Sequence, residues 1–200
     1  MKSCDPAPSS SVRERKRLLR KQIHEAEKLL DASYIRKAGD AVCRHLLSLP
    51  QYTDASTVFC FASMPSELPT DVFLSQAFAD GKRVCVPLCR KNGIMELKAI
   101  CSLSDLRPGF RGIPEPGPDA PSVLPPEVSF AVIPCLSCNM EGDRLGRGGG
   151  FYDRFLAGFN GFAVMVCLDR LITDSIPLEH HDIRIPNVLT EERNTLPQIS

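Results

Sequence analysis

The chain has 200 residues, which suits a single domain with a real hydrophobic core. An apolar content of 43% excludes global disorder, and no apolar run reaches the length of a membrane span. Lys+Arg and Asp+Glu both number 24, so only a local site could bind a polyanion. The N-terminus lacks an apolar secretion signal, and several of the nine cysteines lie in apolar runs. A cytoplasmic protein with reduced thiols is therefore expected.

Residues 1–12 are rich in Pro and Ser and predict a flexible arm, followed by one domain at 13–200. Apolar residues at helical spacing predict an amphipathic helix over 13–32. Its first half is strongly basic, and Lys16 and Arg20 lie one turn apart on one face. A second helix is predicted over 33–50, ended by Pro50.

The hydrophobic period then changes to that of strands. A short helix is predicted between an N-cap at Thr70 and Gly81. Residues 107–127 hold seven prolines and predict a long ordered loop or lid without regular elements. Strands are predicted at 56–65, 82–88, 93–100, 128–134, 161–169 and 187–190, and a further short helix at 152–159. Nearly continuous apolar strands alternating with helices indicate an α/β fold with an open, mostly parallel sheet and helices on both faces.

The segment "GDRLGRGGGFYDRFL", residues 142–156, follows the strand that ends at Pro134 and opens a helix. It is therefore expected at the carboxyl end of a sheet strand, where open α/β sheets bind ligands. Glycines let backbone N–H groups approach an anion, and Arg144 and Arg147 add forked donors. The spacing of these glycines matches neither the P-loop motif nor the GxGxxG motif. An anion site is predicted, with a solvated glycine loop as the alternative.

Three further features allow more than one interpretation. The basic side of the first helix could be an ordinary solvated face, a contact to phosphate or an RNA-binding surface. The aromatic residues that would stack on RNA bases are absent from it. Cys135-x-x-Cys138 is a redox pair, half of a zinc site or, as we interpret it, two thiols at a strand end without zinc. The acids Glu67, Asp153 and Asp182 follow apparent elements, and with a triphosphate they could hold magnesium or orient a substrate.

Five collinear motifs from about residue 13 to 192 resemble one known family, that of 5-formyltetrahydrofolate cyclo-ligase, also called methenyltetrahydrofolate synthetase. The most distinctive motif is "RLGRGGGFYDRFL", and the others are "KRLLR", "SMPSELPTD", "GKRVCVP" and "HHDIRIPNVLTEE". The resemblance implies a fold similar to phosphosugar isomerases and coenzyme A transferases. It also implies ATP-dependent cyclisation of 5-formyltetrahydrofolate to 5,10-methenyltetrahydrofolate, with phosphorylation of the formyl oxygen and release of ADP and phosphate.

The resemblance further implies residue roles, with Arg147 as the catalytic residue and Asp153 and Asp182 as ligands of Mg²⁺. A monomer is expected, with neither a nucleic-acid nor a membrane partner. The implied ATP contacts are Lys16, Arg20, Arg144, Leu145, Gly146, Arg147, Gly148, Gly149, Gly150, Phe151 and Tyr152. The implied folate contacts are Ala62, Glu67, Arg147, Gly148, Gly149, Gly150 and Phe151.

The chain departs from the family pattern at four positions. Gly149 stands where some members have lysine, and Phe151 replaces a frequent tyrosine. Asn139 and Pro186 stand where aspartates are common. These changes remove possible contacts to phosphate and metal. The alternative function is a nucleic-acid-binding or phosphosugar-binding paralogue on the same fold without cyclo-ligase activity.

Overall fold

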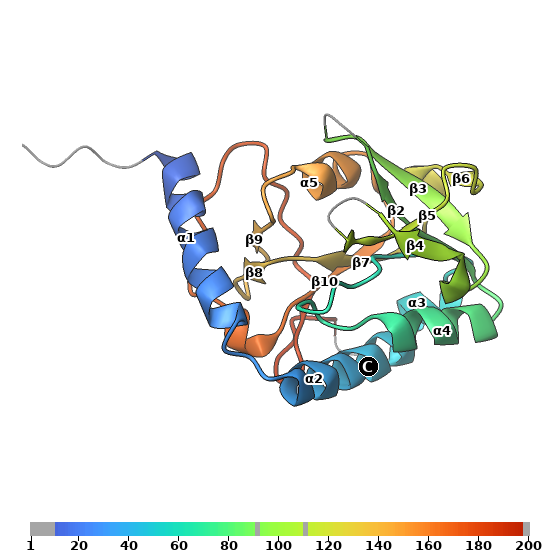
Figure 1. The fold of residues 1–200 in the computed structure, drawn as a ribbon, viewed down its shortest axis with the longest axis horizontal. Coiled ribbons are helices and arrows are strands. Elements are labelled where there is room, and N and C mark those ends of the chain that lie inside the picture. The colour runs from blue at the N-terminus through green and yellow to red at the C-terminus, as the bar shows by residue number, and fades with distance from the viewer. Residues whose placement is uncertain (1–10, 91–92, 110–111, 198–200) are drawn as a thin grey trace, which may run out of the picture.

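The computed structural model describes residues 11–90, 93–109 and 112–197, and a seven-stranded sheet forms its centre (Figure 1). The strands of this sheet are β1 (Thr57–Cys60), β2 (Arg83–Cys89), β3 (Met95–Ile100), β6 (Ser122–Val123), β7 (Phe130–Pro134), β10 (Phe162–Val166) and β11 (Val188–Leu189). Their order across the sheet is β11-β10-β7-β1-β2-β3-β6. All the apolar runs predicted as strands are present in it, and β6 is an additional edge strand.

The five strands from β11 to β2 run parallel to their neighbours, whereas β3 and β6 complete the other edge in antiparallel pairing. Helices α2 (Ala32–Ser48), α3 (Pro50–Asp54) and α4 (Asp71–Ala79) lie on one side of the sheet, and α5 (Phe151–Leu156) lies on the other (Figure 1). Because both sides are covered, the central strands are apolar almost throughout. The predicted α/β class is confirmed.

The helix boundaries correct the predicted end of the first helix, confirm that the second ends before Pro50, and add a short helix after it. Helix α1 (Val12–Glu27) is capped by Ser11 but ends before the predicted limit at 32. Helix α2 is capped by the Asp31 side chain, which accepts from the Tyr34 N–H at 2.8 Å. Pro50 does not belong to α2 but begins α3, because a proline at the first helical position leaves no hydrogen bond unmade.

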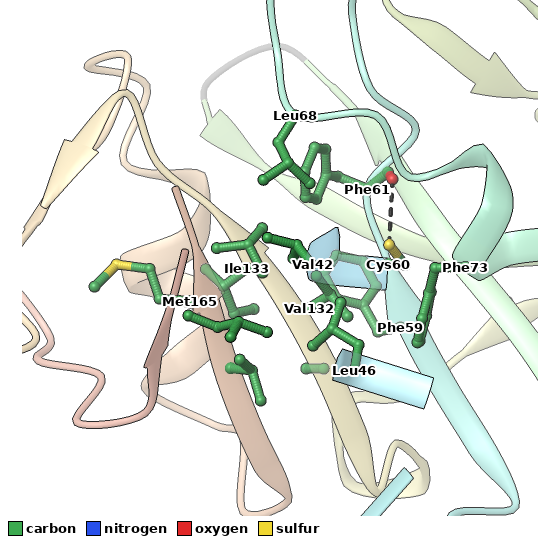
Figure 2. Packing of buried hydrophobic residues seen from close by; sticks show 14 of the residues in the cluster. Val42, Leu46, Phe59, Cys60, Phe61, Leu68, Phe73, Val132, Ile133 and Met165 are labelled. Atoms are coloured by element: carbon green, nitrogen blue, oxygen red, sulfur yellow. Dashed lines mark hydrogen bonds between the residues drawn. The ribbon is translucent and has the colours of Figure 1, made fainter. Parts of the chain in front are cut away.

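The hydrophobic core lies between α2, α4 and the sheet. Figure 2 shows Val42 and Leu46 of α2 packed toward Phe59 of β1 and Val132 of β7. All four side chains are fully buried. Phe73 of α4 extends the core and forms an edge-to-face pair with the ring of Tyr52, their centroids 5.3 Å apart.

Thr70 has a different local role from the predicted one. It occupies the N-cap position of α4, but its side chain caps no helix N–H. Its hydroxyl instead donates a hydrogen bond of 2.7 Å to the carbonyl of Phe61, just beyond β1. Gly81, with φ of 71°, ends the helix as predicted. Thr70 therefore ties the start of α4 to the end of β1.

The proline-rich segment is more regular than predicted. Beyond the helical turn η2 (Leu103–Asp105), β4 (Leu106–Pro108) and β5 (Pro114–Pro116) form an antiparallel pair. Strand β6 and the turn η4 (Pro125–Glu127) follow. Short strands at an edge tolerate proline because one side of their backbone needs no partner. The prediction of a segment without elements is therefore wrong.

The remaining elements are the hairpin β8 (Ser137–Cys138) and β9 (Arg144–Leu145), and the turn η5 (Asp169–Leu171). Of the predicted arm, 1–12, residues 1–10 lie outside the described residues, and the other two cap and begin α1. Within the described ranges, no helix has the length and hydropathy required to cross a bilayer.

Candidate active site

The glycine segment lies where the sequence predicts, beyond the carboxyl end of β7. The chain passes through the hairpin β8–β9, continues through glycines 146, 148, 149 and 150, and enters α5 at Phe151. Gly148 has φ of 97° and Gly150 has φ of 65°, which are left-handed conformations that favour glycine. Gly148 and Gly149 are exposed. Glycine backbone on the C-terminal side of Arg147 is thus presented to solvent beside the start of a helix.

Helix α1 contacts this loop through its basic face. The Arg20 Nε donates to the carbonyl of Gly146 at 2.8 Å. One turn earlier, Lys16 is only 5% exposed, and its Nζ lies 2.7 Å from the Asp182 Oδ1 and 3.1 Å from the Glu179 Oε2. The two basic residues therefore occupy an enclosed position between the glycine loop and the C-terminal segment, not a solvated helix face.

Asp182 is ionised in this arrangement. Burial alone would raise the pKa of its carboxyl group, but the Glu179 N–H and the Lys16 ammonium outweigh that effect. The pKa of Asp182 therefore lies below its ordinary value. Negative charge from Asp182 and positive charge from Lys16 are held together inside the site.

Arg147 is held between two carboxylates from distant parts of the chain. Its Nε donates to the Glu67 Oε1 at 3.0 Å, and its Nη2 donates to the Glu27 Oε1 at 3.2 Å. The Arg147 side chain is 36% exposed, whereas those of Glu27 and Glu67 are 11% and 14% exposed. An anionic ligand can therefore reach the guanidinium from solvent.

Glu27 was not predicted from the sequence. It lies on the same face of α1 as Lys16 and Arg20, because eleven residues correspond to about three helical turns. That spacing is the signal that could have identified it. Arg20 and Glu27 contact the loop, whereas Lys16 contacts the C-terminal segment.

Arg144 is about as enclosed as Lys16. Its side chain is 5% exposed, and its Nη2 donates to the Asp153 Oδ1 at 2.8 Å. Among the described residues, none accepts a hydrogen bond from its buried Nε. Because an unpaired buried donor is costly, this arrangement fits a site that an anionic ligand completes.

The acids implied as magnesium ligands lie against different cations. Asp182 belongs to a group with Glu179 and His181 whose ligand atoms are all within 4.8 Å of one another. Carboxylate oxygens suit a hard cation such as Mg²⁺, so the Asp182 and Glu179 carboxylates fit the ion, whereas the His181 imidazole suits softer metals. Asp153 is not part of that group; its carboxylate pairs with Arg144. Joint ligation by Asp153 and Asp182 therefore stays a prediction.

Three of the residues implied for the folate pocket line cavities, and these cavities are separate. Ala62 lines one of about 390 Å³, whose far wall is formed by Leu106, Arg107 and Pro108 of the β4–β5 pair. Glu67 lines a much smaller cavity of about 20 Å³, together with Arg147 and Glu27. The larger cavity has the size usual for a small-molecule site.

Several positions within the glycine motif are structural. The Leu145 side chain is fully buried in the core, so only its backbone is available to a ligand. The ring of Tyr152 lies 6.3 Å from that of Phe59 and 5.6 Å from the Arg144 guanidinium carbon. A Cβ added at Gly149 would lie 2.6 Å from the ring of Phe151. The two departures at 149 and 151 are therefore sterically linked.

Two further arginines that were not predicted hold this region, Arg154 at the glycine loop and Arg184 at the β8–β9 hairpin. The Arg154 Nη2 donates to the Gly149 carbonyl at 2.7 Å. The Arg184 Nε donates to Asp143 at 2.7 Å, and Asp143 also accepts from the Asn139 side chain at 2.9 Å. Asn139 thus stabilises the hairpin beside the site by pairing with Asp143.

Comparison with known proteins identifies the family of this fold and site. The profile of the 5-formyltetrahydrofolate cyclo-ligase family matches residues 12–191. The 5-formyltetrahydrofolate cyclo-ligase of Escherichia coli (strain K12) is 28% identical, over 86% of this chain and 97% of its own. That of Mycolicibacterium smegmatis is 32% identical, over 68% of this chain and 74% of its own. The NMR structure of Aquifex aeolicus 5,10-methenyltetrahydrofolate synthetase superposes with a TM-score of 0.79 at 27% identity, covering 90% of this chain and 91% of that one. The chain belongs to the 5-formyltetrahydrofolate cyclo-ligase family.

Proposed function

We propose that this enzyme cyclises 5-formyltetrahydrofolate to 5,10-methenyltetrahydrofolate, using ATP and releasing ADP and phosphate. Membership of the cyclo-ligase family supports the reaction. The observation that carries ATP use is the hydrogen bond from Arg20 to the Gly146 carbonyl, because it joins the basic face of α1 to the glycine loop. Lys16, Arg20, Arg144 and Arg147 then surround one site that suits a polyphosphate.

The chemistry requires activation of a poor electrophile. The formyl oxygen attacks the γ-phosphorus of ATP, the bond from that phosphorus to the bridging oxygen breaks, and ADP leaves. N10 adds to the activated formyl carbon, and phosphate departs with the former formyl oxygen while the N10 proton passes to solvent. These reaction steps need charge stabilisation and alignment of the reacting atoms, but no covalent enzyme intermediate.

The residues of the site can supply that stabilisation. Arg147 has access to solvent and donates through two of its nitrogens, so it can exchange its carboxylate partners for phosphoryl oxygens. The buried Nε of Arg144, which has no acceptor among the described residues, would supply another donor once the loop moves to expose it. The backbone N–H groups of Gly148 and Gly149 lie in an exposed loop. Lys16 reaches a phosphate by releasing Asp182.

Mg²⁺ fits this proposal as a partner of ATP. The carboxylates of Asp182 and Glu179 would hold the ion once Lys16 has turned toward phosphate, and Asp153 is a further candidate ligand. When bound, the ion neutralises phosphate charge. We further propose a cytoplasmic monomer without a nucleic-acid partner.

The decisive test of ATP use follows one oxygen atom. Substrate labelled with oxygen-18 in the formyl group is expected to give labelled phosphate and unlabelled ADP in a single turnover, measured by mass spectrometry. Product is followed in parallel by the absorbance of the methenyl group, with an ATP-free reaction as control. Unlabelled phosphate would contradict phosphorylation of the formyl oxygen. Salt-sensitive RNA binding that survives Arg147→Ala, without methenyl product, would instead favour the paralogue.

A further inference from the structure

Three thiols that have no assigned role in the reaction meet at the carboxyl ends of two neighbouring strands, beside the small cavity that Glu67 and Arg147 also line. Pro134 of β7 and Val166 of β10 are paired in register, so Cys135 and Cys167 leave the sheet side by side. Strand β8 brings Cys138 back to the same place. The three Sγ atoms lie within 4.8 Å of one another. The cysteines of the described ranges are all free thiols.

The separation of these thiols suits a metal ion. With Zn–S bonds of about 2.3 Å, tetrahedral geometry places sulfur atoms about 3.8 Å apart. Small side-chain rotations close the difference from the observed limit of 4.8 Å. Cys138 and Cys167 are buried and Cys135 is half-buried, so the donors are held by packed strand ends.

A small cavity provides the remaining coordination position. Its volume is about 20 Å³, and Cys135 and Cys167 form part of its wall. A cavity of that size holds about one water molecule. Zinc sites with three protein ligands keep the fourth position for water. The cluster and the cavity together therefore supply three sulfur atoms and one oxygen.

The three sulfur atoms must lose their protons when a cation binds. The Cys135 Sγ donates a hydrogen bond to the Val166 carbonyl at 3.4 Å, so this proton in particular must be displaced by the incoming cation. Binding thus exchanges S–H bonds for metal–sulfur bonds and releases protons, without any redox change.

We propose that Cys135, Cys138 and Cys167 bind one thiophilic divalent cation of the zinc group, with a water molecule from the adjoining cavity as the fourth ligand. This replaces the interpretation of Cys135 and Cys138 as a pair of thiols without zinc. Sequence spacing does not reveal the third thiol, because Cys167 joins the cluster only through the pairing of β7 with β10.

The test uses Cd²⁺ as the probe and the full, reduced chain. We expect one Cd²⁺ per chain and a sulfur-to-cadmium charge-transfer absorbance that corresponds to three thiolates. Cys135→Ser is the decisive variant, because its half-buried side chain can change with little loss of packing. It is expected to retain two thirds of the absorbance and to bind at least about tenfold more weakly. Cys101→Ser is the matched control, since Cys101 is exposed and outside the cluster.

Three results would overturn the site. The first is no stoichiometric Cd²⁺ in the reduced protein. The second is a Cys135→Ser variant whose absorbance and affinity match those of the unaltered protein. The third is an equal loss of binding in Cys101→Ser. Circular dichroism and urea unfolding of Cys135→Ser separate ligand loss from misfolding.

Discussion

Gly148→Ala tests whether the conformation of the glycine loop is needed for ATP. An added Cβ would find space, because its nearest neighbour is the Arg20 Cζ at 3.6 Å. The penalty is therefore backbone strain at φ of 97°, which is about 1–3 kcal/mol for a residue other than glycine. If the loop keeps its shape, that free energy is lost from stability. If the loop instead relaxes to an unstrained conformation, ATP binding must restore the original conformation, and the KM for ATP rises about 5- to 150-fold.

The assay combines urea unfolding with steady-state kinetics at varied ATP concentration. Gly158→Ala is the matched control, since no atom lies within 4 Å of its added Cβ and its φ is not left-handed. It should be neutral, or more stable by about 0.4–1 kcal/mol through the unfolded state. If Gly148→Ala equals Gly158→Ala in both stability and KM, the proposed role of the left-handed loop is wrong.

Three further predictions concern charges of the site. Arg147→Ala should fold, because the ion pairs of Arg147 are partly exposed, but kcat should fall about 100- to 1000-fold. Unchanged turnover would show that Arg147 takes no part in the reaction. Lys16→Ala and Arg20→Ala should both raise KM for ATP. Lys16→Ala should also lower the free energy of unfolding by about 3 kcal/mol, since it leaves the buried Asp182 carboxylate without its cation. If Arg20→Ala lowered the free energy of unfolding equally, this role of Lys16 would be contradicted. Asp182→Asn should be less stable than the unaltered protein at pH 7. Because the pKa of Asp182 is lowered in the folded state, this difference should shrink as the pH falls below 3.8, and a difference independent of pH would show that the carboxylate charge is unimportant.

The parallel core and the glycine site were predictable because local sequence encodes both. The apolar runs at 57–60, 130–134 and 162–166 are long enough to indicate buried strands, and four clustered glycines indicate a loop at a strand end. The end of α1 was less predictable. Leu29 continues the apolar pattern of the helix, yet it is 85% exposed beyond the last turn. Hydrophobic spacing alone therefore overextended the helix.

Contacts between distant parts of the chain could not be predicted in the same way. Arg147 meets Glu27 across 120 residues, and Lys16 meets Asp182 across 166. No local pattern pairs these charges, because many acids in the sequence could serve equally well. The fold decides the pairing by bringing α1 across the loop and the C-terminal segment.

The attachment of α1 has a consequence for how the site opens. Of the residues in this helix, only Lys16 and Ile23 are buried, so much of its docking depends on Lys16, Arg20 and Glu27. A helix held largely by charge can detach locally at a small fraction of the free energy of global unfolding. Its amide hydrogens should therefore exchange faster than those of β1 and β7. A nucleotide that binds Lys16 and Arg20 would slow that exchange, because its binding would stabilise the docked position of α1.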